Sequence, residues 1–143
     1  MVIMHKTLYA SGFIYHLPTE QILLQKLQSI VSPWILFEQI YIEHEQPETI
    51  FKDNILKLLC IKIDTVYPIY SYINETTKNN RSLFYATTED LQEFLPKDNY
   101  MFRWFSFKEV LKIQTTEQTK HDIVVGQRVI EAAARRRRGE HTF

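Results

Sequence analysis

The order of apolar and polar residues divides the chain into short segments of distinct pattern. In residues 6–16, small or apolar side chains recur at every second position, which predicts a strand with one buried face. A turn at 17–20 separates this segment from an apolar run at 21–25, which predicts a strand or, if the pattern continues through Leu27 and Ile30, a helix. The run at 34–37 also has the length of a strand.

A helical spacing of apolar residues follows these strands. The segment 43–48 is rich in acidic residues and contains Pro47, which predicts a helix start, because proline fits a first turn and carboxylates complement the helix dipole. Phe51 and Ile55 continue one apolar face. Cys60 lies close to that face, and we expect it to be a buried, inert thiol.

The second half of the chain has patterns that predict further strands and three more helical segments. Strands at 61–72 and 81–86 flank a polar turn at 74–80, which indicates a hairpin. Capping residues at 87–90 predict a short helical piece that ends near Pro96. Three final elements are expected: a strand at 100–105, a capped helical turn at 106–111, and a helix from Lys120 into the arginine run. This order predicts an α+β fold with one central mixed sheet.

Composition places these elements in one globular domain. The chain has 143 residues, of which 45% are hydrophobic and 24% charged, enough for a single core. The formal net charge is zero, which excludes an overall field that attracts nucleic acid or anionic membranes. Cys60 is the only cysteine, which excludes an intramolecular disulfide. With neither an apolar run of membrane-spanning length nor a targeting segment, we expect a soluble, cytoplasmic protein with no membrane partner.

The four consecutive arginines Arg135, Arg136, Arg137 and Arg138 are the strongest local charge feature. We therefore divide the chain into a domain at 1–134 and a basic C-terminal tail at 135–143. The arginines are candidates for binding a ligand phosphate, an acidic protein or RNA. The alternative is a solvated helix end, where cations suit the dipole and Gly139 ends the helix. His121 has the same two interpretations, a phosphate contact or a residue of the helix start.

The segment 34–61 resembles a degenerate Nudix box, whose pattern is G-x5-E-x7-R-E-U-x-E-E-x-G-U with U aliphatic. Residues 34–39 stand where the family has W-x-L-P-G-G, and residues 44–48 (HEQPE) match its G-E-x-P-E segment in one ungapped register. Residues 103–106 and 121–130 are similar to the strand end and terminal helix of family members. The resemblance implies a Nudix-like α/β/α sandwich around a central mixed sheet, and it favours a strand at 21–25.

In this register most of the polar positions of the box have changed. Glu45 matches the first glutamate and is the surviving catalytic candidate. Asp53 occupies the arginine position, and Cys60 replaces the last glycine. The three later glutamates are replaced by Asn54, Lys57 and Leu58, which share one face of a helix.

The resemblance implies the chemistry that these changes affect. Family members hydrolyse nucleoside diphosphates linked to another group, with Mg²⁺ or Mn²⁺ held by the box glutamates. Hard divalent ions require oxygen ligands, and Lys57 would repel a cation. We therefore expect a domain that binds a nucleotide or another phosphorylated ligand, or a protein partner, with weak or absent hydrolysis.

Two alternatives stay open. Glu43, Glu45 and Asp53 could form a displaced metal site if a metal binds, or they could be solvated surface residues. A divergent metal-dependent hydrolase would use Glu45 together with carboxylates from outside the box, for which Glu89, Glu93 and Glu117 are the candidates. An interaction module that contacts its partner through the basic tail is a third class.

Overall fold

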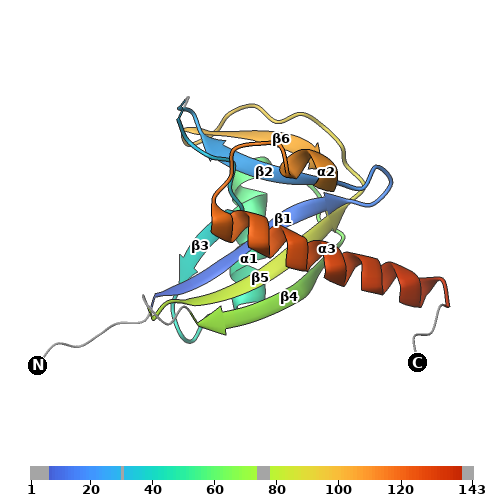
Figure 1. The fold of residues 1–143 in the computed structure, drawn as a ribbon. Helices are drawn as coiled ribbons and strands as arrows, with labels where there is room; N and C mark the ends of the chain where they lie inside the picture. The colour runs from blue at the N-terminus through green and yellow to red at the C-terminus, as the bar shows by residue number, and fades with distance from the viewer. Residues whose placement is uncertain (1–6, 30, 74–77, 140–143) are drawn as a thin grey trace, which may run out of the picture.

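The computed structural model describes residues 7–29, 31–73 and 78–139, which form six strands and three helices (Figure 1). In chain order these are β1 (Leu8–His16), β2 (Gln21–Leu27), β3 (Phe37–Tyr41), α1 (Pro47–Leu59), β4 (Thr65–Ile73), β5 (Asn80–Thr88), β6 (Tyr100–Ser106), α2 (Phe107–Val110) and α3 (Glu117–Arg137).

β1 is the central strand of a mixed sheet. One of its edges pairs with β5 in parallel along the whole strand. Its other edge pairs antiparallel with β3 in the first half and with β2 in the second half. β4 and β6 extend the sheet outward in the order β4-β5-β1-β2-β6. β3 and β5 both flank the first half of β1, so long side chains of these two strands that point to the same face of the sheet can reach each other across β1.

Helices cover both faces of this sheet. α3 crosses in front of it and α1 lies behind it in Figure 1. Phe51 and Ile55 of α1 pack with Ile14 in one core, whereas Ile123 of α3 packs with Phe13 in the other. The predicted α+β class and α/β/α arrangement are confirmed. The expectation that the first strand is half-buried was wrong, because each of its faces lies under a helix.

α3 approaches the sheet closely at Gly126. A Cβ atom at this position would lie 2.8 Å from the ring of Phe13, which is shorter than side chains tolerate. Glycine therefore lets the middle of α3 pack directly on β1.

Capping residues set the helix starts. The Ser106 hydroxyl accepts a hydrogen bond from the backbone N–H of Glu109, and the Glu109 carboxylate accepts one from the backbone N–H of Ser106. The predicted capped turn is therefore confirmed. Thr116 caps α3 in the same way through the N–H of Thr119. This helix therefore begins three residues before the expected Lys120.

Three local predictions were wrong. Residues 34–35 form only isolated bridges, and the strand expected at 34–37 begins instead at Phe37. The helical piece expected after 87 is absent from this described segment: Thr88 belongs to β5, and its hydroxyl donates to the carbonyl of Lys62 rather than starting a helix. The strand expected from Ile61 begins at Thr65, although the predicted β4–β5 hairpin is confirmed. Most of the expected polar turn, residues 74–77, lies outside the described residues.

Candidate functional site

α1 is the helix of the segment that resembles the Nudix box. Pro47 occupies its first turn, as the family pattern implies. Lys57 is exposed, Asn54 is half-buried, and Leu58 packs against the edge of the core. These three positions offer an amide, an ammonium and an isobutyl group, so they supply no carboxylate to a divalent cation.

Glu45 lies in the turn that precedes α1. Its Oε1 accepts a hydrogen bond of 2.9 Å from the backbone N–H of Ile42, and the Glu45 N–H donates to the Ile42 carbonyl at 2.9 Å. The carboxylate therefore closes a turn. Glu43 is exposed in that turn, and Asp53 is exposed on α1. Within residues 7–29, 31–73 and 78–139, no three His, Cys, Asp or Glu side chains are grouped to hold a metal ion.

Cys60 ends α1 in a left-handed backbone conformation, with φ 54° and ψ 34°. Its N–H donates to the carbonyl of Leu56 at 3.0 Å. This is the position of the last glycine in the box pattern, and the backbone keeps the conformation that glycine adopts most easily. The expectation of a buried thiol was wrong: Cys60 is exposed and unpaired, because the helix ends one residue before it.

A charged cluster lies on the α3 side of the sheet. Arg81 of β5 forms an ion pair with Glu38 of β3, with 2.7 Å between Nη1 and Oε1. Ser11 of β1 lies between them and donates to Glu38 at 2.9 Å. Nη2 of Arg81 also lies 3.8 Å from Oδ2 of Asp122 in α3. We call these residues, together with Tyr70 and Gln118, the Arg81 cluster.

Asp122 is the most deeply buried member of this cluster, with no solvent exposure. Its Oδ1 accepts hydrogen bonds from the Tyr70 hydroxyl at 2.7 Å and from Gln118 at 2.9 Å. Burial and the bond to Asp122 together raise the pKa of Tyr70 far above its ordinary value of 10.0. His121 lies at the rim, with its Nδ1 3.2 Å from the Tyr70 oxygen.

Two buried atoms of the cluster have no hydrogen-bond partner within the described part of the chain. They are Nε of Arg81 and Oδ2 of Asp122. The 3.8 Å ion-pair contact of Oδ2 with Arg81 is too long for a hydrogen bond. Buried polar atoms of native proteins are paired in about nine cases of ten, so these two atoms call for a partner such as a water or a ligand.

A cavity of about 190 Å³ opens beside this cluster. We call it the Arg81 cavity. Its walls come from the bridge region before β3, from β3 and β5, and from the first turn of α3. The lining residues are Ile35, Leu36, Glu38, Arg81, Thr116, Gln118 and Thr119. A cavity of 150 Å³ is known to hold a benzene molecule, so this volume accepts one ring with its substituents.

The four arginines of the C-terminal run lie at the opposite end of α3. All are exposed, and α3 continues without a break through Arg137, so the boundary drawn at 134 falls inside a helix. Arg137 lies 18 positions after Thr119, which corresponds to roughly 27 Å along a helix. The structure therefore does not bring these arginines to the Arg81 cavity. Arg137 instead lines a second cavity.

Arg81 and Asp122 were not identified as candidates from the sequence. They are 41 positions apart, and Glu38 lies 43 positions before Arg81. The pairing of β3 and β5 with the two edges of β1 brings Glu38 and Arg81 together, and the packing of α3 on the sheet adds Asp122. The one available signal is that Arg81 is the only charged residue of β5.

Solved structures with a similar fold cover nearly the whole chain. A MutT/Nudix family protein from Listeria innocua superposes with a TM-score of 0.72 at 14% identity, over 89% of this chain and 95% of that one. The Nudix domain of Shewanella oneidensis NrtR, solved with ADP-ribose, gives 0.68 at 9% identity, over 90% of each chain. The Escherichia coli ORF135 protein gives 0.66 at 17% identity, over 90% and 94%. At these identities the similarity establishes the fold alone.

Comparison of the sequence with known proteins identifies no relative. No protein-family model matches the chain, and no curated protein matches it. Among the helices of the described residues, none is long and apolar enough to cross a membrane.

Proposed function

We propose that this chain, which has the Nudix fold, binds a nucleotide-like or other phosphorylated small molecule and hydrolyses it weakly or not at all. The observation that carries the proposal is the Arg81 cluster, whose Arg81 Nε and Asp122 Oδ2 are buried without a partner among the described residues. A bound ligand or a water would satisfy such atoms.

The charges of the cluster favour the base or sugar of such a ligand over its phosphate. One guanidinium and the two carboxylates of Glu38 and Asp122 sum to a negative charge, which disfavours a phosphate in the Arg81 cavity. Amino, imino and hydroxyl donors of a base or sugar suit it better, because carboxylates accept hydrogen bonds strongly. The Nudix domain of NrtR was solved with ADP-ribose, which carries such donors on both its base and its sugars. That structure supports a nucleotide-like ligand class here.

The altered box supports binding rather than hydrolysis. Catalysis by the family requires carboxylates on one face of the box helix, where this chain has Asn54, Lys57 and Leu58. Loss of a general base alone lowers a rate by about 10²–10⁴-fold, and loss of the metal ligands adds to that. We infer a degenerate box on a fold that keeps its ligand cavity.

Two further expectations accompany this function. We propose a cytoplasmic setting, because the one cysteine is an exposed free thiol that a reducing compartment keeps reduced. An acidic protein or RNA partner of the Arg135–Arg138 run stays a prediction. Salt-sensitive binding that is lost on deletion of residues from Arg135 onward would support it.

Binding is tested by calorimetry with ADP-ribose and adenosine monophosphate as probes. Glu38→Gln keeps the shape of the cavity wall and removes one carboxylate charge, so we expect at least about tenfold weaker binding. Asp98→Asn is the matched control, because it removes one exposed carboxylate from a distant loop, and we expect no change. Equal affinities of the two variants, or no binding of either probe to the wild type, would overturn the proposal.

Hydrolysis is tested with a panel of nucleoside diphosphate derivatives and Mg²⁺ or Mn²⁺. We expect no turnover above that of a mock purification. Glu45→Gln is the informative variant, because the amide oxygen still accepts the hydrogen bond from Ile42 and the turn is kept. Wild-type turnover that disappears in Glu45→Gln would replace our proposal with a divergent hydrolase, and Glu89, Glu93 and Glu117 would be tested next.

A further inference from the structure

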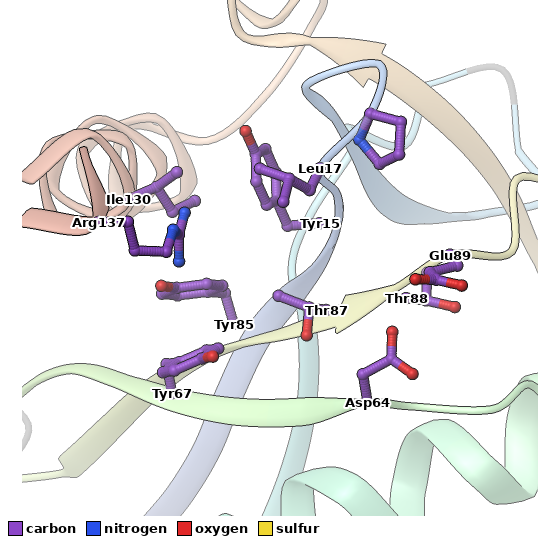
Figure 2. A pocket seen from close by; sticks show the side chains of 11 residues that line it. Tyr15, Leu17, Asp64, Tyr67, Tyr85, Thr87, Thr88, Glu89, Ile130 and Arg137 are labelled. Atoms are coloured by element: carbon purple, nitrogen blue, oxygen red, sulfur yellow. The ribbon is translucent and has the colours of Figure 1, made fainter. Parts of the chain in front are cut away.

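A second cavity, of about 180 Å³, lies under the C-terminal end of α3 (Figure 2). It is bounded by the ends of β1 and β5, by the edge strand β4 and by the last turns of α3. We call it the tyrosine cavity. Ile130 is the first α3 residue that lines it, 11 positions after Thr119 of the Arg81 cavity, which corresponds to roughly 17 Å along the helix, so a molecule with one ring cannot fill both.

Three tyrosines from adjacent strands form its walls. The rings of Tyr67 and Tyr85 are stacked, with centroids 5.0 Å apart and planes at 22°. Tyr15 meets Tyr85 edge to face at 6.3 Å and 90°. Tyr15 and Tyr85 are each only 3% exposed, whereas Tyr67 is 36% exposed, so the aromatic wall runs from the interior to the surface. Such a surface favours a flat ligand.

A cation stands at one end of the tyrosine cavity. Figure 2 shows Arg137 reaching from α3 toward Tyr85. Burial raises the pKa of Tyr15 and of Tyr85, and the positive charge of Arg137 opposes that rise at both. No carboxylate among the described residues forms an ion pair with Arg137. An arginine in this setting favours an anionic group.

Carboxylates stand at the other end. Asp64 and Glu89 lie beyond Thr87 on the side away from Arg137 in Figure 2. Both are exposed, and their carboxylates have no hydrogen-bond or ion-pair partner in the part of the chain that the structure describes. The cavity is therefore positive at one end, negative at the other and aromatic between them.

We propose that the tyrosine cavity is a second ligand site, which binds a small aromatic zwitterion. The carboxylate or phosphate of the ligand pairs with Arg137, its ring lies against the tyrosine wall, and its amino group faces Asp64 and Glu89. The volume sets the size: about 180 Å³ exceeds the 150 Å³ that holds benzene by only a few atoms, so the ligand has one ring. This site is independent of the function proposed for the Arg81 cavity.

The probe that fits this description is 4-(aminomethyl)benzoate, in which one ring separates an ammonium from a carboxylate. Benzoate lacks the ammonium and benzylamine lacks the carboxylate, so we expect each to bind at least about tenfold more weakly by calorimetry. The phosphate analogue 4-(aminomethyl)phenyl phosphate distinguishes the two anion sources. Tighter binding of either zwitterion supports the site and identifies the anion. Failure of both zwitterions to bind the full chain would overturn the proposal.

Variants at the two ends test the assignment of charges. Arg137→Gln should weaken 4-(aminomethyl)benzoate binding about tenfold. Arg135→Gln, in the same exposed helix end but outside the cavity, should leave it unchanged. The double variant Asp64→Asn, Glu89→Gln should bind 4-(aminomethyl)benzoate and benzoate equally. Glu38→Gln should have no effect, which separates this site from the Arg81 cavity. Equal binding by the two arginine variants would overturn the assignment.

Discussion

Arg81 of β5 and Glu38 of β3 form an ion pair of 2.7 Å across β1, although their two strands do not pair with each other. Ser11 of the intervening strand donates to Glu38, and Asp122 lies on the far side of Arg81 in the helix that covers them. Arg81 thus connects three strands of the sheet to α3. Asp122 is fully buried, and the Arg81 guanidinium is the permanent positive charge beside it; His121, with its Nδ1 3.5 Å from Oδ1, adds a charge only if it is protonated.

Replacement of Arg81 should therefore destabilise the protein strongly. We expect Arg81→Met to lower the free energy of unfolding by about 3 kcal/mol, because it leaves the buried carboxylate of Asp122 without its permanent counter-charge. Urea denaturation at neutral pH measures this change. Arg128→Met, at an exposed position of α3, serves as the control and should change little.

A second substitution in the same cluster should restore part of the stability that Arg81→Met loses. Asp122→Asn in the Arg81→Met background removes the uncompensated charge, keeps the acceptor for Tyr70 and should recover part of the lost stability. Additive losses in the double variant would show that the two charges are not coupled, contrary to the ion-pair geometry.

The pattern of apolar residues predicted the framework of the fold because its main elements are locally encoded. The helix at Pro47 and the capped turn at Ser106 carry their own start signals, and the structure confirms both. The prediction after 87 was wrong for a physical reason: Thr88 had the residue type of a cap, but pairing with β1 kept it in a strand. Sheet partners decided that segment, and they are distant in the sequence.

The candidate sites show the same limit. The helix of the segment that resembles the box could be predicted from its spacing, and the structure places α1 there; the assignment of Asn54 and Lys57 to box positions stays a prediction. The cluster of Arg81 and Asp122 could not be found in this way, because it depends on strand register and on the placement of α3. Charge pattern alone drew attention to Arg137, but not to the tyrosines that it faces.

The left-handed end of α1 at Cys60 can be tested by stability. Its left-handed conformation, with φ 54°, is costly for residues with a Cβ atom. We expect Cys60→Gly to raise the free energy of unfolding by about 1 kcal/mol and Cys60→Val to lower it by a similar amount. Cys60→Ala separates the backbone effect from loss of the thiol. A glycine variant less stable than the alanine variant would contradict the backbone assignment.

The raised pKa of Tyr70 predicts how the free energy of unfolding changes at alkaline pH. Burial and its hydrogen bond to Asp122 raise the pKa of its phenol in the folded state, whereas the unfolded chain keeps the ordinary value of 10.0. Stability from this group is complete below about pH 10 and declines as the pH rises above it, because the unfolded state then loses the proton first. Tyr70→Phe should show a shallower decline in urea denaturation between pH 9 and pH 11.

Tyr72 is the control for this pH effect. Burial also raises the pKa of its phenol, but no hydrogen bond from its hydroxyl to Asp122 contributes. Tyr72→Phe should therefore change the slope less than Tyr70→Phe does. Identical slopes in the wild type and the Tyr70 variant would show that the phenol titrates alike in the folded and unfolded states.

Carboxylates introduced at the positions that the resemblance assigns to the box test whether α1 can present a metal site. The resemblance places family glutamates at positions 54, 57 and 58, which share one face of α1. We expect Mn²⁺ to leave the melting temperature of the wild type unchanged, because Lys57 repels the cation and Asn54 offers a single weak ligand. In the variant with Asn54→Glu, Lys57→Glu and Leu58→Glu, three carboxylates on one face should bind Mn²⁺ and raise the melting temperature, since a ligand that binds only the folded state stabilises it. A matched variant with glutamine at the same three positions keeps the side-chain size without the charge and should not respond. Stabilisation of the wild type by Mn²⁺ would mean that carboxylates outside this face, with Glu45 the first to examine, already hold the ion.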